Sequence, residues 1–106
     1  MNPNELGRFD DASFLVLSSL AGGPKHGYAM IEDIEVFSGT RLEPGTLYGA
    51  ISRLEKLGWI ESLPVDERRR PYRLTAAGST AFRRHAATLE KVAAVSKSRL
   101  ATLRGP

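Results

Sequence analysis

The sequence predicts a mainly α-helical protein with one small β-hairpin, in the order three helices, hairpin, long terminal helix. Three observations predict this class. Apolar residues recur with the period of a helix in EPGTLYGAISRLEKLG, two short alternating runs flank a turn-forming segment, and residues 76–103 are rich in Ala, Leu, Arg and Lys without a proline. A chain of 106 residues has the usual size of one domain, so we expect one structural domain overall.

The first two helices follow from capping signals and apolar spacing. Asp11 or Ser13 can cap a helix through FLVLSSLAG that ends near Gly22. This helix is apolar around most of its circumference, which predicts a buried central element. A second helix is expected from about His26 to Phe37, with Gly39 just beyond its end.

The third helix, in EPGTLYGAISRLEKLG, has the clearest periodicity in the chain. Leu47, Ile51 and Leu54 recur on one face, and Gly58 is a natural terminator. The opposite side is small and polar and carries no acidic side chain. This asymmetry predicts one buried face and one face available to a partner.

The runs WIESL and PYRLT, separated by PVDERRR, predict a hairpin with a basic tip and with Pro64 and Asp66 as turn residues. Pro71 lies inside the second run, where it fits only if its position needs no backbone N–H, as at a sheet edge. We expect Trp59, at the start of the first run, to pack in the core or in a dimer.

The terminal segment predicts one long helix from Thr75 onward. Its apolar stripe is interrupted by Ser96 and Arg99, and a helix this long cannot bury the stripe against so small a core. A second copy of the chain is the expected cover, so we divide the chain into residues 1–75 and a dimerisation helix over residues 76–106. The candidate dimerisation residues are Phe82, Leu89, Val92, Ala93, Leu100 and Leu103.

Charge is distributed unevenly. The net charge is +3, but residues 1–40 carry a net −4 and residues 41–106 a net +7, which favours a polyanionic partner for the second part. The sequence has no cysteine, which excludes disulfides and thiolate chemistry and is compatible with a reducing cytosol. No leader-like or membrane-spanning run is recognised, so we expect a cytoplasmic protein.

Three helices followed by a basic hairpin form the plan of a winged helix-turn-helix, in which the third helix enters the major groove and the hairpin, or wing, reaches neighbouring phosphates. Glycines allow close approach, hydroxyls bind phosphates or base edges, and basic groups supply charge. The predicted partner is double-stranded DNA. The candidate DNA-binding residues are Lys25, Gly45, Thr46, Tyr48, Gly49, Ser52, Arg53, Lys56, Arg68, Arg69, Arg70 and Arg73.

Two other classes of protein are alternatives to a DNA-binding regulator. A winged module that binds only protein is the main alternative, and the salt dependence of DNA binding distinguishes it, because phosphate neutralisation makes affinity fall steeply with ionic strength. An enzyme is not expected. His26 and His85 lie in different predicted helices without metal-ligand spacing, and no nucleophile elbow or phosphate-cradling loop is present. We predict no metal and no cofactor.

Four ordered motifs between Phe14 and Phe82 make the chain resemble the PadR family of transcriptional regulators, in its short-chain branch. Each motif is a short group at family spacing. They are Gly27 and Tyr28 on the second helix, Gly45 to Tyr48 at the start of the third, Leu54, Glu55 and Gly58 at its exit, and Tyr72, Leu74, Thr75 and Gly78 at the junction with the last helix.

The resemblance implies a homodimeric repressor whose last helix forms the dimer, with repression relieved by a small molecule or a stress signal in some members. Gly49 departs from the family, which often has proline there, and Pro71 departs within the second wing strand. The terminal helix also lacks the tryptophan that some drug-binding relatives use, so an aromatic-drug pocket is not carried over.

Overall fold

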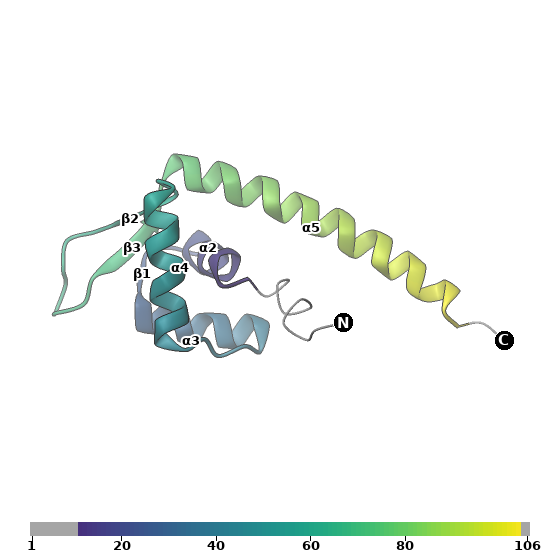
Figure 1. Cartoon of the computed structure of the whole chain (residues 1–106), viewed down its shortest axis with the longest axis horizontal. Helices are drawn as coiled ribbons and strands as arrows, with labels where there is room; N and C mark the ends of the chain where they lie inside the picture. Colours follow the sequence, from purple (N-terminus) through teal and green to yellow (C-terminus); the bar gives the residue numbers. More distant parts are fainter. Residues whose placement is uncertain (1–10, 105–106) are drawn as a thin grey trace.

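The computed structural model describes residues 11–104, which form four helices and three short strands (Figure 1). This confirms the predicted mainly helical class and the order of its elements. The elements are α2 (Ala12–Ala21), β1 (Lys25–His26), α3 (Gly27–Ser38), α4 (Pro44–Lys56), β2 (Ile60–Ser62), β3 (Pro71–Leu74) and α5 (Ala76–Thr102).

The helix ends follow the predicted signals. Asp11 caps α2, its carboxylate accepting a hydrogen bond of 2.7 Å from the backbone N–H of Ser13. Gly39 ends α3 with φ 76°, and Gly58 follows α4 with φ 75°. Residues with a Cβ rarely adopt this left-handed conformation, so glycine is the natural choice at both turns.

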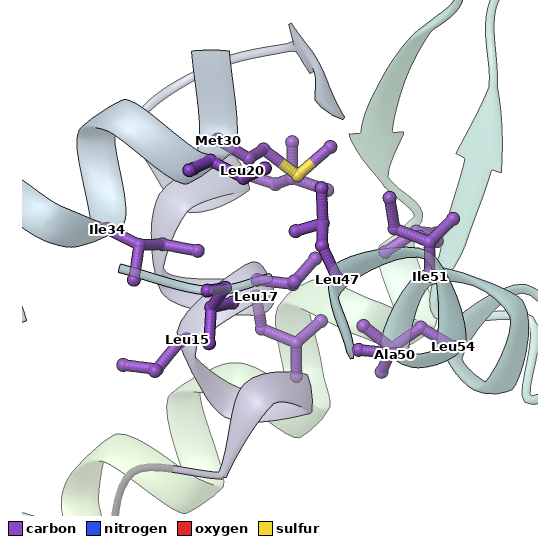
Figure 2. Close-up of a cluster of buried hydrophobic side chains, with 13 residues drawn as sticks. Leu15, Leu17, Leu20, Met30, Ile34, Leu47, Ala50, Ile51 and Leu54 are labelled. Atoms are coloured by element: carbon purple, nitrogen blue, oxygen red, sulfur yellow. The ribbon is translucent and has the colours of Figure 1, made fainter. Parts of the chain in front are cut away.

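The core lies where α2, α3 and α4 meet (Figure 2). Met30 and Ile34 from α3 and Leu47 from α4 are completely buried, and Val16 from α2 is buried among them. Trp59 is partly buried and packs against this cluster, as expected for a core residue. The buried residues of this cluster are at most 8% exposed, so the cluster supplies the main apolar burial of the described residues.

The sheet has three antiparallel strands in the order β1-β3-β2, one more than the predicted hairpin. The added strand, β1, pairs Lys25 with Tyr72 and His26 with Pro71. Pro71 therefore lies in the central strand and not at an edge as we expected. It is the first residue of that strand, where a proline is tolerated, and its carbonyl accepts a 2.8 Å hydrogen bond from Leu63.

The tip of the wing is a tight turn between Asp66 and Arg69. Their backbones exchange two hydrogen bonds, of 2.7 and 2.9 Å. The two central residues, Glu67 and Arg68, have φ of 48° and 69°, the pattern of a type I′ turn. Of the predicted turn residues, Asp66 begins the turn, while Pro64 lies before it.

One junction joins the end of α4, the sheet and the start of α5. The hydroxyl of Thr75 donates to the carbonyl of Gly58 at 2.6 Å and accepts from the N–H of Gly78 at 3.0 Å, which caps α5. Gly78 is buried, and a Cβ there would lie 2.7 Å from the carbonyl carbon of Trp59. The junction therefore leaves no room for a larger residue than glycine.

Beyond this junction α5 leaves the rest of the fold and extends along the 60 Å long axis of the molecule (Figure 1). Its first turns pack back on α2, with the Phe82 and His85 rings 5.7 and 4.7 Å from the Phe14 ring. The helix ends at Thr102, so Leu103 is its C-cap and lies one residue beyond the helix. None of the helices described is long and apolar enough to cross a membrane.

Candidate nucleic-acid interface

The outer face of α4 presents small and polar side chains to solvent. Gly45, Thr46, Ser52 and Lys56 are exposed, and Gly49 is partly exposed. No atom comes within 4 Å of a Cβ built on Gly45. A helix with so little bulk on one face can approach another surface closely, which the major groove of a duplex requires.

Tyr48 lies on the side of α4 that faces α3. Its ring crosses Gly27, where a Cβ would stand 2.8 Å from the ring carbon Cζ, so only glycine leaves room for it. About half of Tyr48 remains exposed, at 51%. The pairing of Gly27 with Tyr48 thus positions a phenol at the opening between α3 and α4.

Arg53 lies on the other side of α4, toward α2. Its guanidinium donates to the hydroxyl of Ser13 at 3.2 Å, and both side chains are at the surface. Arg53 and Tyr48 therefore mark opposite margins of the exposed face, with Ser52 and Lys56 between them.

The wing arginines do not form one uniform cluster. Arg68, Arg69 and Arg70 line a hollow of about 320 Å³ that also includes Tyr48 and Tyr72. Arg70 donates to the carbonyl of Leu63 at 3.0 Å. The hollow joins the wing to the α3–α4 side of the molecule, so these elements form one continuous surface.

Arg73 lies outside the hollow, on β3. Its guanidinium pairs with Glu61 of β2 at 2.7 Å, and both side chains are about half exposed. This neighbour neutralises much of the charge that Arg73 would offer a phosphate. Among the predicted basic residues of the wing, Arg73 therefore has the least free charge.

Burial raises the pKa of Tyr72 above its ordinary value of 10.0. The carboxylate of Glu55 and the neighbouring Tyr48 add to this rise, while Arg70 opposes it. Tyr72 is half-buried and packs against the core. The structure thus gives Tyr72 a packing role within the wing.

Lys25 points inward. Its ammonium group donates to the carbonyl of Ser19 at 2.5 Å and lies 3.9 Å from the carboxylate of Asp33. The hydroxyl of Ser19 also donates to Asp33, at 2.7 Å. The charged group of Lys25, a predicted DNA-binding residue, therefore serves a network that joins β1 to α2 and α3.

Two residues near this surface were missed by the sequence reasoning. Arg41, in the turn between α3 and α4, donates to Glu35 at 3.1 Å, and hydrogen bonds with Glu35 and Tyr28 raise the pKa of Arg41. His26 caps α3 and contacts Arg69, which is 43 positions away in the sequence. No local pattern signals contacts of either kind.

The predicted dimerisation residues divide into two groups. Phe82 is partly buried within its own chain, and Leu89 is half-buried. Val92, Ala93, Leu100 and Leu103 are exposed, and every residue from 91 to 104 is exposed as well. Within residues 11–104, no group of three or more His, Cys, Asp or Glu side chains could hold a metal ion.

A three-helix core, an exposed third helix and a basic wing define a winged helix-turn-helix regulator. The model of the transcriptional regulator PadR-like family matches residues 16–84, and the chain belongs to that family. Members of the family are transcriptional regulators that bind DNA, not enzymes.

Several similar proteins support this placement. A 37.1 kDa protein of transposon TN4556 from Streptomyces fradiae is 46% identical over 85 residues, which is 80% of this chain. The chain spans only 25% of that relative's length. A PadR family transcriptional regulator from Eggerthella lenta is 30% identical, with a TM-score of 0.73 over 92% of this chain and 87% of its own.

A transcriptional regulator from Clostridium thermocellum is 27% identical, with a TM-score of 0.74 over 92% of this chain and 96% of its own. A PadR family regulator from Clostridium difficile, at 24% identity, shares the fold with a TM-score of 0.76 over 84% of this chain and 97% of its own. These solved relatives thus share the fold over 84–92% of this chain.

Proposed function

We propose that this protein is a sequence-specific, homodimeric transcriptional repressor that acts in the cytoplasm. The observation that carries the proposal is the outer face of α4, which is exposed, small and polar and continues into a wing hollow lined by Arg68, Arg69 and Arg70. In this proposal α4 enters the major groove, with Ser52 and Lys56 toward the bases, and the wing contacts the flanking backbone.

The proposed dimer uses the outer part of α5. Val92, Val95 and Leu100 are exposed apolar side chains on this part of α5, so the described chain does not cover them. Pairing two such helices buries these side chains and sets two α4 helices about one turn of DNA apart, ~34 Å. A small molecule that changed the angle between the paired helices would change this spacing and relieve repression.

The first test is selection of bound fragments from random duplex DNA, followed by titration of the selected site at several salt concentrations. We expect a two-fold site and an affinity that falls steeply with salt. Replacing Arg68, Arg69 and Arg70 together with Ala should weaken specific and nonspecific binding alike and flatten the salt dependence. A parent that selects no duplex would instead favour the protein-binding module.

The second test addresses the dimer. Leu89→Asp combined with Val92→Asp places two carboxylates in the proposed apolar seam, where burying them is strongly unfavourable. The variant should sediment as a monomer and lose tight binding to the selected site, while its helical content is retained. A parent that sediments as a monomer at micromolar concentration yet binds a two-fold site tightly would contradict the arrangement.

A further inference from the structure

His26 and Arg69 meet where the start of α3 touches the wing. The hydrogen bonds around this pair leave two donors without an acceptor. The Nδ1 atom of His26 accepts the backbone N–H of Ala29 at 3.2 Å, so this nitrogen carries a lone pair. In a neutral imidazole the proton must then be on Nε2. The guanidinium of Arg69, which has only donors, lies 3.1 Å from that same Nε2. Two donors therefore face each other without an acceptor.

The backbone holds this pair together. Strand pairing places His26 opposite Pro71, and the two backbone hydrogen bonds of the wing turn fix the position of Arg69. These bonds fix the backbones of both residues, while the exposed side chain of Arg69 can still turn about its own bonds. The fold thus keeps the two side chains within reach of each other.

No acidic group relieves the contact. Within residues 11–104, no carboxylate oxygen lies within 4.0 Å of a nitrogen of Arg69, since the ion pairs there involve other basic residues. The hollow beside the pair is lined by three arginines and three tyrosines and by no acid. His26 and Arg69 also line a second hollow, together with Asp66 and Glu67, but neither carboxylate comes within ion-pair distance of Arg69. Among residues 11–104, then, no carboxylate serves as the acceptor for both donors, and an anion from outside the chain could supply it.

We propose that His26 and Arg69 form a two-donor clamp for one backbone phosphate of the bound duplex. When the flexible side chain of Arg69 turns aside from the 3.1 Å contact, a phosphate oxygen can enter and accept from both the Nε2–H and the guanidinium. Charge-assisted bonds of this kind are about twice as strong as neutral ones. The inference rests on the proposed DNA binding. It assigns His26, from outside α4 and the wing, a role in positioning the wing, because a phosphate held in the clamp ties the wing to α3.

The test is a double-mutant cycle on the selected duplex. His26→Ser keeps a good helix cap but removes the ring, and Arg69→Gln removes the charge. Each change should lower affinity about tenfold, and the two together should lower it little more than one alone. As a matched control, His26→Ser combined with Lys56→Ala should give additive losses. Thermal unfolding confirms the fold of each variant, and His26→Asn serves as a second variant that keeps the cap.

Replacing phosphates one at a time with neutral methylphosphonate locates the clamp. At one position in each half-site the parent should lose about tenfold, while the His26 and Arg69 variants should be unaffected. Nitrogen NMR of the free protein should show the His26 proton on Nε2, and adding the duplex should shift that resonance.

Several results would overturn the clamp. If the losses in the His26 and Arg69 cycle were additive, the clamp would be wrong. Tight, salt-dependent binding by the parent would in that case still support the proposed function. A proton on Nδ1 would also overturn the clamp. If inorganic phosphate moved the Nε2 resonance as the duplex does, and no methylphosphonate position distinguished the variants, the pair would be a site for free anions. A parent without affinity for DNA would end both proposals.

Discussion

Residues 12–75, the winged head, and residues 91–102, the outer part of α5, belong to one chain but are held in different ways. In the head, Met30, Ile34 and Leu47 are fully buried by partners from other helices. In the outer part of α5, every side chain is exposed, Leu100 at 61% among them. The head is therefore stabilised by tertiary packing, and the outer helix by its own backbone hydrogen bonds and good helix-forming residues.

This difference shows how one small chain keeps the folding of its head separate from the proposed pairing of its outer helix. A helix on its own is marginal in water, so the outer part of α5 gains most from a partner that covers it. The head does not need a partner to bury its apolar side chains, because its own helices already cover them. Folding of the head and pairing of the helix should consequently respond to different mutations.

The largest expected effect distinguishes the two regions directly. Leu47→Ala removes a fully buried side chain and should lower the free energy of unfolding by about 2–5 kcal/mol. Leu100→Ala should change it by less than about 0.5 kcal/mol in dilute protein. Denaturant titrations at two protein concentrations provide the measurement. If Leu100→Ala proved as harmful as Leu47→Ala at both concentrations, the outer helix would have to pack on its own head.

The next prediction concerns the junction between the two regions. Gly78→Ala would place a Cβ 2.7 Å from the carbonyl carbon of Trp59 and should lower the free energy of unfolding by about 1–3 kcal/mol. Gly45→Ala is the matched control, since nothing lies within 4 Å of its Cβ and alanine favours a helix by about 1 kcal/mol over glycine. Opposite signs are expected in urea titrations. A stable Gly78→Ala variant would mean that α5 can shift at its base.

The smallest expected effect concerns the head alone, where Tyr72 should make the free energy of unfolding depend on pH. Burial raises the pKa of Tyr72, so the neutral phenol is favoured in the folded state. This contribution is fully present below the unfolded pKa of about 10 and is lost as the pH rises through the folded value, because the unfolded chain releases its proton first. The free energy of unfolding should therefore fall above about pH 10 more steeply in the parent than in Tyr72→Phe. Parallel slopes would show that Tyr72 is not desolvated.

The sequence predicted the elements held by local signals. The period of Leu47, Ile51 and Leu54 and the terminating Gly58 placed α4, and the proline-free tail placed the start of α5 within one residue of Ala76. The fold class was correct for this reason. Capping and periodicity act over a few residues, and a sequence displays them directly.

Features that depend on distant partners were missed. Strand β1 has only two residues, too few to show alternation, and it exists because β3 lies beside it. That same pairing made Pro71 central in the sheet. The wing turn has Glu67 and Arg68 at positive φ instead of the Asn-Gly pair that usually signals a type I′ turn.

The sequence predicted only part of the candidate interface, because local patterns are visible in a sequence and distant contacts are not. Periodicity identified the exposed face of α4, and the basic segment PVDERRR between two alternating runs identified the arginines of the wing. It could not show that Arg53 turns toward Ser13, that Lys25 serves Ser19 and Asp33, or that His26 meets Arg69. Each of these depends on how the helices and the wing pack together.

The absence of space at Gly78 also has a geometric consequence. A helix of 27 residues is about 40 Å long, so a rotation of only ~5° at its base moves its far end by roughly 3.5 Å. The α5 helix is in this sense a lever whose pivot is the contact between Gly78 and the Trp59 carbonyl. Any rotation at this contact would become a larger displacement at the far end of the helix. Packing too tight for a methyl group limits that rotation and so fixes the direction of α5.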